Sequence, residues 1–374
     1  MISVKPIPLD TLWPQYGQAK TMERKLDFSA QTNRLLYKRI SAIDRFKGKW
    51  EAIEQQQNRN LRHLRLVATV QSIGSSTRIE GSTMSDAEVE TLLKNMKITE
   101  LKTRDEQEVG GYYDVLNLLL DSYREIPLTA SNILSLHNLL MKYSQKDEYH
   151  RGKYKKLTNR VVANYPDGTQ KTVFRTTEIH LVQKEMSELL EWTQSTLKEE
   201  EYHPLLVIGA FIYEFLSIHP FQDGNGRLSR LLSTLLLLQN GYQFVQFVSF
   251  ENLIESRKAD YYRALMDGQK DRYAEHERID KWLFFFLDNL EELANRLERK
   301  YEQILKRGGY LSARRQEILD FLSTKGNVQI ADVLAQFSQL PRSTMKADLT
   351  YLVREYYLQK TGVGRGTVYS VRTV

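Results

Sequence analysis

The chain has 374 residues, 41% of them hydrophobic, and a formal net charge of +6 from 53 Lys and Arg against 47 Asp and Glu. This length predicts two or three domains with a sizeable core, and the mild charge permits anionic partners without requiring them. The sequence contains no cysteine, which excludes disulfides, thiolate metal sites and a cysteine nucleophile. We expect a cytoplasmic location.

Helical periodicity dominates the N-terminal part of the chain. Residues 28–75 form a polar, amphipathic segment without proline. The segment "EGSTMSDAEV" then predicts a turn, after which Ser85 caps a helix with Glu88 as its capping-box partner. Further helices are expected over 105–123 and 127–143. Residues 1–55 carry no motif that indicates chemistry.

The character of the sequence changes over residues 150–177, which are rich in Thr, Val and Tyr around a Pro-Asp-Gly segment. This composition predicts a β-hairpin that turns near residues 166–168. A lone hairpin in a helical chain is either a structural strut or a flap. Helices are expected again from about 177 to 306, and the glycine pair at 308–309 predicts a hinge.

The last segment, residues 310–374, is predicted to be a separate unit of three short helices followed by two strands. This order is typical of a winged helix-turn-helix, whose third helix binds the DNA major groove. We therefore expect DNA contacts over 342–356 and 362–368. Asp348 and Glu355 weaken that expectation, and winged helices also serve in protein docking or dimerisation.

The most apolar stretch runs from residue 205 to 238 but contains Glu214, His219, Asp223 and two arginines. It cannot cross a bilayer as one helix, and we expect no membrane partner. It predicts instead two buried helices, over 205–218 and from about Asn225, joined by a short loop.

The loop and the start of the second helix have the composition of an anion site. A helix N-terminus offers unpaired N–H groups and the positive end of its dipole. Gly224 and Gly226 let a phosphate approach this backbone closely. Arg227 and Arg230 are three residues apart, so both are expected to reach the site and to bind more than one phosphate.

Two further side chains of this segment suggest a reaction. Asp223 is a carboxylate suited to Mg²⁺ on phosphate oxygens, and His219 is placed to act as a general base. Several features of this segment have an ordinary structural alternative. A lone histidine or a Gly-Asn-Gly segment is usually structural, and an arginine pair is usually solvated. Their occurrence together within twelve residues favours the functional interpretation.

The segment "HPFQDGNGRLSR" (219–230) resembles the signature of the Fic family. The resemblance implies a mainly α fold, a Fic-type helical bundle with a β-hairpin flap, here joined to a small α+β winged-helix C-terminal domain. It implies transfer of AMP from ATP to a Ser, Thr or Tyr hydroxyl of a target protein. The roles it implies are base (His219), Mg²⁺ ligand (Asp223), anion hole (Gly224, Asn225, Gly226), outer phosphates (Arg227, Arg230) and loop anchor (Phe221).

Two more segments resemble parts of the family. "RKADYYRALMDGQ" (257–269) is similar to its adenosine-side helix, so Tyr262 is expected to pack on adenine and Gln269 to hydrogen-bond it. Many relatives carry Asn at the position of Gln269. A tyrosine on an amphipathic helix, such as Tyr262, is as often a core residue. The hairpin is similar to the flap that pairs with an extended target segment.

Upstream, "SSTRIEGS" resembles the family's inhibitory motif, with Ser76, Glu80 and Gly81 in place. Such a glutamate would pair with Arg230 and remove the cation that the γ-phosphate needs. The alternative is an ordinary helix end, since Gly is favoured there. The expected divisions are an N-terminal helical region with the inhibitory helix (1–95), a Fic catalytic core (96–306) and the winged helix-turn-helix (310–374).

Two functions from different classes compete. One is a protein adenylyltransferase inhibited by its own Glu80; some such relatives also remove AMP, and the sequence leaves that reverse reaction open. The other is a DNA-binding transcriptional regulator with a nucleotide-sensing Fic core. The intact His219 and Asp223 favour the enzyme. A homodimer is plausible for this class.

Overall fold

The computed structural model describes residues 18–55, 59–96, 100–164, 170–306, 311–354, 357–362 and 364–372. The expected hairpin turn at 166–168 and the expected hinge at 308–309 lie outside the described residues, as do residues 1–17. Side chains of the hairpin strands and of Arg365 are likewise outside them.

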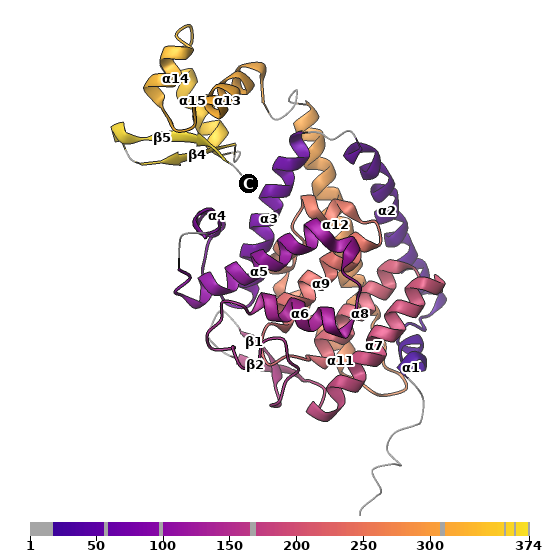
Figure 1. Cartoon of the computed structure of the whole chain (residues 1–374). Coiled ribbons are helices and arrows are strands. Elements are labelled where there is room, and N and C mark those ends of the chain that lie inside the picture. The colour runs from indigo at the N-terminus through magenta and orange to yellow at the C-terminus, as the bar shows by residue number, and fades with distance from the viewer. Residues whose placement is uncertain are drawn as a thin grey trace, which may run out of the picture.

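The larger part of the chain is helical, with one hairpin between α6 and α7 (Figure 1). Its helices are α1 Gln18–Lys25, α2 Ala30–Glu54, α3 Arg59–Ile79, α4 Asp86–Asn95, α5 Arg104–Ser122, α6 Ala130–Leu140, α7 Ile179–Glu199, α8 Pro204–Ile218, α9 Asn225–Gln239, α10 Phe250–Ser256, α11 Lys258–Gln269 and α12 Asp280–Lys306. Short 3₁₀ turns occupy Tyr123–Glu125 and Gln243–Phe247.

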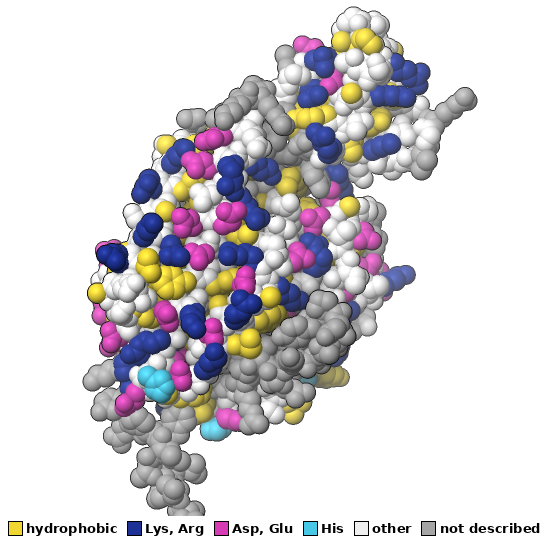
Figure 2. Space-filling view, turned by 180° about the vertical axis from the view of Figure 1, so that it is seen from behind, with side chains coloured by type: hydrophobic (Ala, Val, Ile, Leu, Met, Phe, Trp, Pro, Cys, Tyr) yellow, Lys and Arg dark blue, Asp and Glu magenta, His cyan; other side chains and the backbone are white. Residues whose placement is uncertain are grey.

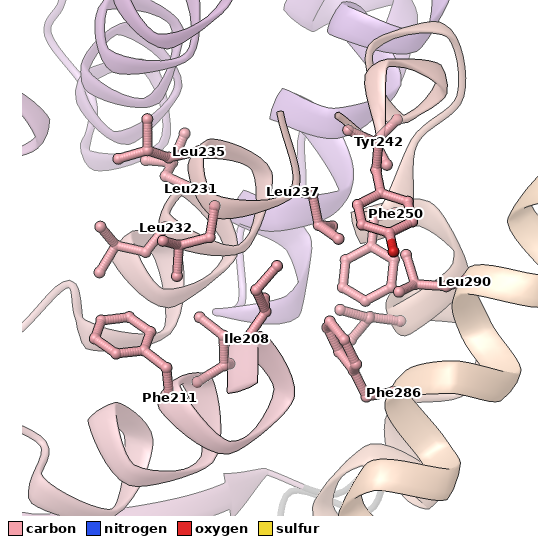
Figure 3. Close-up of a cluster of buried hydrophobic side chains, with 14 of the residues drawn as sticks. Ile208, Phe211, Leu231, Leu232, Leu235, Leu237, Tyr242, Phe250, Phe286 and Leu290 are labelled. Carbon is pink, nitrogen blue, oxygen red and sulfur yellow. The ribbon is translucent and has the colours of Figure 1, made fainter. Parts of the chain in front are cut away.

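The helices α8 and α9 form the centre of the molecule. Every residue of α8 from Leu205 to Ile218 is buried, as expected for a helix that is apolar on all sides. It packs against α7, α9 and α12, while α9 also contacts α3, α5 and α6. Figure 3 shows the resulting cluster, in which side chains of α8, α9 and α12 meet, among them Phe211, Leu232 and Phe286.

Several local predictions are confirmed. The two buried helices are present, and α9 begins at Asn225. The capping box at the start of α4 is formed by Ser85 and Glu88 in both directions. The polar, amphipathic segment over 28–75 contains two helices, since α2 ends at Glu54 and α3 begins at Arg59.

The hairpin consists of β1 Arg160–Asn164 and β2 Gln170–Arg175, which pair antiparallel. The register shifts between Val161 and Val162, as it does where one strand carries an extra residue. The prediction of a hairpin over this region is confirmed; residues 150–159 precede it as turns and irregular backbone.

The C-terminal segment forms a second, smaller unit, yellow and orange in Figure 1. It consists of α13 Ala313–Lys325, β3 Val328–Gln329, α14 Ile330–Gln336, α15 Arg342–Arg354, β4 Leu358–Thr361, a 3₁₀ turn Gly364–Gly366, and β5 Val368–Val371. The antiparallel sheet has the order β3-β5-β4, so one short strand adds to the three helices and two strands that were expected. The winged helix-turn-helix assignment stays a prediction.

Two separate hydrophobic clusters divide the described residues. One runs from Met22 to Tyr301, and the other from Ile318 to Tyr369. The expected division near residue 95 is not marked by a core of its own, and it stays a prediction. Within the described ranges, no helix combines the length and the apolar character that crossing a bilayer requires.

A buried ionic network fixes α1 to the centre of the molecule. Lys25 contacts Glu214 of α8 and lies 3.1 Å from Glu277. Arg272 binds Glu214 at 3.1 Å and Glu185 of α7 at 3.4 Å. Burial acts to raise the pKa of Glu214, but Lys25 and Arg272 hold it below its usual value. Glu214 therefore stays charged inside the protein only through these cations.

Replacing Lys25 by methionine should destabilise the fold strongly, because it leaves buried carboxylates short of a cation. We expect the free energy of unfolding, measured by urea titration, to fall by about 3 kcal/mol. Lys49→Met is the matched control, since the Lys49–Glu298 pair is partly exposed and should contribute less than about 1 kcal/mol. Equal losses in the two variants would show that the buried network is not what holds α1.

Candidate active site

The loop between α8 and α9 begins and ends at residues whose backbone is in the left-handed region, with a positive φ. His219 ends α8 with φ 52°, and Gly224 precedes α9 with φ 79°. The Asn225 side chain closes the loop, since its Oδ1 accepts from the Phe221 N–H at 2.9 Å and its Nδ2 donates to the Phe221 carbonyl at 2.8 Å. Asn225 and Phe221 are both buried. The asparagine side chain thus holds the loop, which leaves the backbone N–H groups to form any anion hole.

A cavity of about 230 Å³ opens over this loop and the start of α9. Its lining comes from α3, α8, α9, α11, the segment before the hairpin and the loop itself: Glu80, Asn159, Leu216, His219, Gln222, Asp223, Gly224, Asn225, Gly226, Arg230, Tyr261, Tyr262 and Leu265. The structure therefore brings the expected base, glycines, metal ligand and one arginine to a single cavity.

His219 has the protonation state that a general base needs. Its Nδ1 lies 3.2 Å from the Leu216 carbonyl, which can only accept a hydrogen bond, so Nδ1 carries the proton. Its Nε2 has no hydrogen-bond partner among the described residues. Burial lowers the pKa of His219 to about 4, so the ring is neutral near pH 7 and can accept a proton at Nε2.

Arg230 is held by the end of α3. It is 2% exposed, and its Nη2 binds the Glu80 carboxylate at 2.7 Å. Its Nε donates to the Ser76 hydroxyl at 2.7 Å and its Nη2 to the Ser76 carbonyl at 3.0 Å. Burial acts to raise the pKa of Glu80, but Arg230 outweighs it and holds that pKa below its usual value. The expected contact between the two charges is present.

The backbone at Glu80 is also an ordinary helix end. The Gly81 N–H donates to the Arg78 carbonyl and the Ser82 N–H to the Thr77 carbonyl, with Gly81 at φ 110°. These two bonds make a Schellman motif. The glycine therefore ends α3, as the ordinary alternative predicts, and Glu80 at this end also contacts Arg230. The inhibitory role of Glu80 stays a prediction.

Asp223 lines the cavity as an ionised carboxylate. Burial acts to raise the pKa of Asp223, but Arg227 and the Gly224 N–H hold it below its usual value. Its contacts with the described residues all use Oδ1: the Gly224 N–H at 2.6 Å and Arg227 at 3.4 Å. The other oxygen is left for a cation. The described residues contain no group of three or more metal-ligating side chains. A single carboxylate is a donor that Mg²⁺ accepts together with phosphate oxygens and water, and the metal role of Asp223 stays a prediction.

The structure separates the two arginines of the motif. Arg227 does not line the cavity of His219; it is 1% exposed and lies 3.5 Å from Glu108 of α5 and 3.4 Å from Asp223. It lines a neighbouring cavity of about 280 Å³, which Asp223 also borders. Sequence reasoning missed Glu108, because nothing in the motif points to a residue of α5. The nucleotide-binding role of Arg227 stays a prediction.

Of the two residues expected on the adenosine side, Tyr262 lines the cavity and Gln269 does not. Tyr262 lines the cavity together with Tyr261, and their rings meet edge to face with centroids 5.2 Å apart. Gln269 is not among the lining residues, and its side chain donates to the Ser217 hydroxyl. Its contact with adenine stays a prediction. The sequence did not indicate Tyr261, because two adjacent tyrosines give no pattern that tells which of them, or whether both, face the cavity.

The base of the hairpin is fixed to the same loop. Asn159, just before β1, donates to the Phe221 carbonyl at 2.8 Å. Lys155 is buried and donates to Asn159, to Thr176 after β2 and to the Ile218 carbonyl at the end of α8. These contacts place the start of the hairpin beside His219, as a flap over the cavity requires.

Comparison with known proteins agrees with this geometry. Residues 127–237 match the model of the Fic/DOC family. The chain is 27% identical over 234 residues to the protein adenylyltransferase Fic of Drosophila willistoni, which covers 62% of this chain and 44% of the relative. It is 30% identical over 207 residues to that of Drosophila melanogaster, covering 55% and 39%. The chain thus spans less than half the length of these curated relatives.

Solved structures show a shared fold. A crystal structure of a Fic family protein from Desulfovibrio desulfuricans G20 is similar with a TM-score of 0.60 at 22% identity, covering 90% of this chain and 95% of that chain. Fic-1 from C. elegans is similar with a TM-score of 0.53 at 20% identity, covering 73% and 74%. The mainly helical arrangement is therefore one already seen in Fic proteins.

The stability of the fold should fall below neutral pH through the buried imidazole of His137, which lies on α6 under the loop. Burial lowers the pKa of His137 from 6.5 to about 4. As pH falls below 6.5 the unfolded chain binds the proton first, so stability is lost between about pH 6.5 and 4. We expect His137→Phe to remove about 2 kcal/mol of the loss between pH 7.5 and pH 5.

Urea unfolding of both proteins at the two pH values, with a chelator present, measures this difference. An identical pH dependence in wild type and variant would contradict the buried, neutral state of His137.

Proposed function

We propose that this protein is an adenylyltransferase that moves AMP from ATP to a Ser, Thr or Tyr hydroxyl of a target protein. The match of residues 127–237 to the model of the Fic/DOC family supports this proposal. The observation that carries the proposal is the cavity where His219, the start of α9 and the Arg230–Glu80 pair meet. The curated relatives named protein adenylyltransferase Fic support the same reaction.

The reaction would use the loop as follows. The N–H groups at the start of α9, next to Gly224 and Gly226, would hold phosphate oxygens, and Arg230 would hold the terminal phosphate. His219 Nε2 would accept the proton of the target hydroxyl. The hydroxyl oxygen would form a bond to the α-phosphorus while the bond to the bridging oxygen breaks, and pyrophosphate would leave.

Asp223 would hold Mg²⁺, which neutralises charge on the phosphates when bound. On the nucleoside side, Tyr262 would pack on adenine and Gln269 would hydrogen-bond it. For that contact, Gln269 would have to give up the Ser217 hydroxyl. The target segment would pair with the edge of the hairpin, whose base is fixed beside His219.

Glu80 would keep the enzyme inhibited. A Cβ on Gly226 would collide with the Glu80 carboxylate, so this carboxylate lies directly on the backbone of the proposed phosphate cradle. It also occupies Arg230. A phosphate at this place would meet a negative charge and lose its cation.

Replacing Glu80 by glycine should activate the protein. The change frees one charge-assisted bond of Arg230 for phosphate, which corresponds to a rate increase of about 10- to 100-fold. The measurement is incorporation of labelled AMP into proteins of a cell extract, or into the chain itself, with Mg²⁺ and ATP.

The control is the same variant with His219→Ala, which should lower the rate by about 10² to 10⁴ through loss of the general base. If Glu80→Gly protein labels no protein, itself included, the transferase proposal fails. If the double variant labels as fast as Glu80→Gly alone, His219 is not the base.

DNA binding by the C-terminal unit is a second candidate function, and one observation favours it. Asp348 of α15 is 1% exposed and is bound by Arg314 and Arg315 of α13 at 2.6 and 2.7 Å. The negative charge of Asp348 is therefore paired with cations inside the C-terminal unit. The exposed side chains of α15 include three cations and no described acid: Arg342, Ser343, Lys346, Ala347, Thr350 and Arg354. Glu355 and residues 356 and 363 of the expected contacts lie outside the described residues.

Basic side chains do gather on this unit, as Figure 2 shows on one of its faces. We expect Arg342→Ala with Lys346→Ala to weaken binding to random duplex DNA. Each lost phosphate contact should reduce the slope of log affinity against log salt by about 0.9. Gel shifts at several salt concentrations measure this.

Lys184→Ala with Lys198→Ala is the matched control, because it removes two exposed charges from α7 instead. DNA binding is refuted if wild type binds no duplex, or if both pairs of substitutions act equally. The expected homodimer would present two copies of α15, and sedimentation of the same samples with and without DNA tests it.

A further inference from the structure

His137 is a buried side chain that connects two loops below the cavity. It belongs to α6 and is 2% exposed. Its Nδ1 lies 2.9 Å from the Gly152 backbone nitrogen, and its Nε2 lies 3.0 Å from the Asp223 carbonyl oxygen. The ring thus bridges the segment before the hairpin and the loop that carries Asp223.

These two partners determine which nitrogen carries the proton. The Gly152 N–H can only donate, so Nδ1 must be unprotonated and accept. The Asp223 carbonyl can only accept, so Nε2 must carry the hydrogen and donate. A neutral imidazole with its hydrogen on Nε2 satisfies both backbone groups.

The ring also supports the loop by packing. It stacks on Phe221 with centroids 3.7 Å apart and planes 9° apart. A Cβ on Gly224 would lie 3.4 Å from His137 Nε2 and 3.1 Å from Met141 Sδ, with φ of 79° at this glycine. The loop is therefore seated closely on α6 at the residue that follows Asp223.

We propose that His137 is a positioning residue that fixes the Asp223–Gly224 peptide, and with it the carboxylate that would hold the metal ion of a bound Mg²⁺-nucleotide. The proposal rests on the proposed function. His137 itself lines neither neighbouring cavity, so it would act through the loop, and on Asp223 through its carbonyl. Partners one step removed from a metal ligand commonly change metal affinity by about 10- to 100-fold.

Two substitutions separate the hydrogen bond from the packing. His137→Phe keeps a ring on Phe221 and loses the donor, whereas His137→Gln keeps a donor near the place of Nε2 and loses the ring. Both are made in Glu80→Gly protein. Binding of Mn²⁺ to the protein saturated with a non-hydrolysable ATP analogue is followed by electron paramagnetic resonance, and AMP transfer is measured over a range of Mg²⁺ concentrations.

We expect His137→Phe to raise the Mn²⁺ dissociation constant and the apparent KM for Mg²⁺ about tenfold. His137→Gln should stay within about threefold of the parent, because it retains the donor. Equal weakening in both variants, or no change in His137→Phe, overturns the proposal. So does a parent that binds no Mn²⁺ with the nucleotide.

The tautomer gives a test on unsubstituted protein. The ¹⁵N spectrum of the histidine rings should show His137 protonated at Nε2 and bare at Nδ1, and the opposite tautomer overturns the proposal. If the parent binds Mn²⁺ and nucleotide but transfers no AMP, the proposed function fails, and the Mn²⁺ comparison still decides the role of His137.

Discussion

The contact between Arg230 and Glu80 joins the fold to the proposed chemistry. A guanidinium that is 2% exposed must be paired, and Arg230 forms three hydrogen bonds with α3 and the residue that follows it. Two of them go to Ser76 and one to Glu80. The serine bonds would keep Arg230 in place without the carboxylate, so the ion pair can be broken while α3 and α9 stay packed. The contact that we propose to be inhibitory could therefore be removed without removing the core packing of Arg230.

The loop before α9 is held by side chains from α6, from the segment before the hairpin and from the start of α9 itself. Asn225 binds both backbone groups of Phe221, Asn159 binds its carbonyl again, and His137 binds the carbonyl of Asp223. His137 and Asn225 are buried, whereas Asn159 is half-buried, and both asparagines line the cavity while their side chains hold the loop. Through these contacts, the backbone N–H groups at the start of α9 stay in one arrangement before a ligand arrives, which lowers the cost of ordering them on binding.

Local patterns in the sequence predicted the parts of the site that local geometry determines. The start of α9 at Asn225 and the capping box of Ser85 follow from local motif and cap chemistry, whereas the contact of Glu80 with Arg230, 150 residues apart, was expected from the family resemblance alone. The direction of Arg227 does not follow from local patterns, because Glu108 comes from a distant helix and pairs with it at 3.5 Å. The role of His137 was also out of reach, since its two partners lie 15 and 86 residues along the chain.

Charge counted along a sequence differs from charge presented on a surface. Asp348 weakens the case for DNA binding when α15 is read as a list of residues, yet its carboxylate is consumed by Arg314 and Arg315. Glu108 similarly uses part of the charge of Arg227. A buried acid neutralises the cations that it contacts, whereas exposed cations elsewhere still contribute to the electrostatic potential of the surface. The electrostatics of a face therefore depends on which charges remain unpaired after folding, and this is set by tertiary contacts.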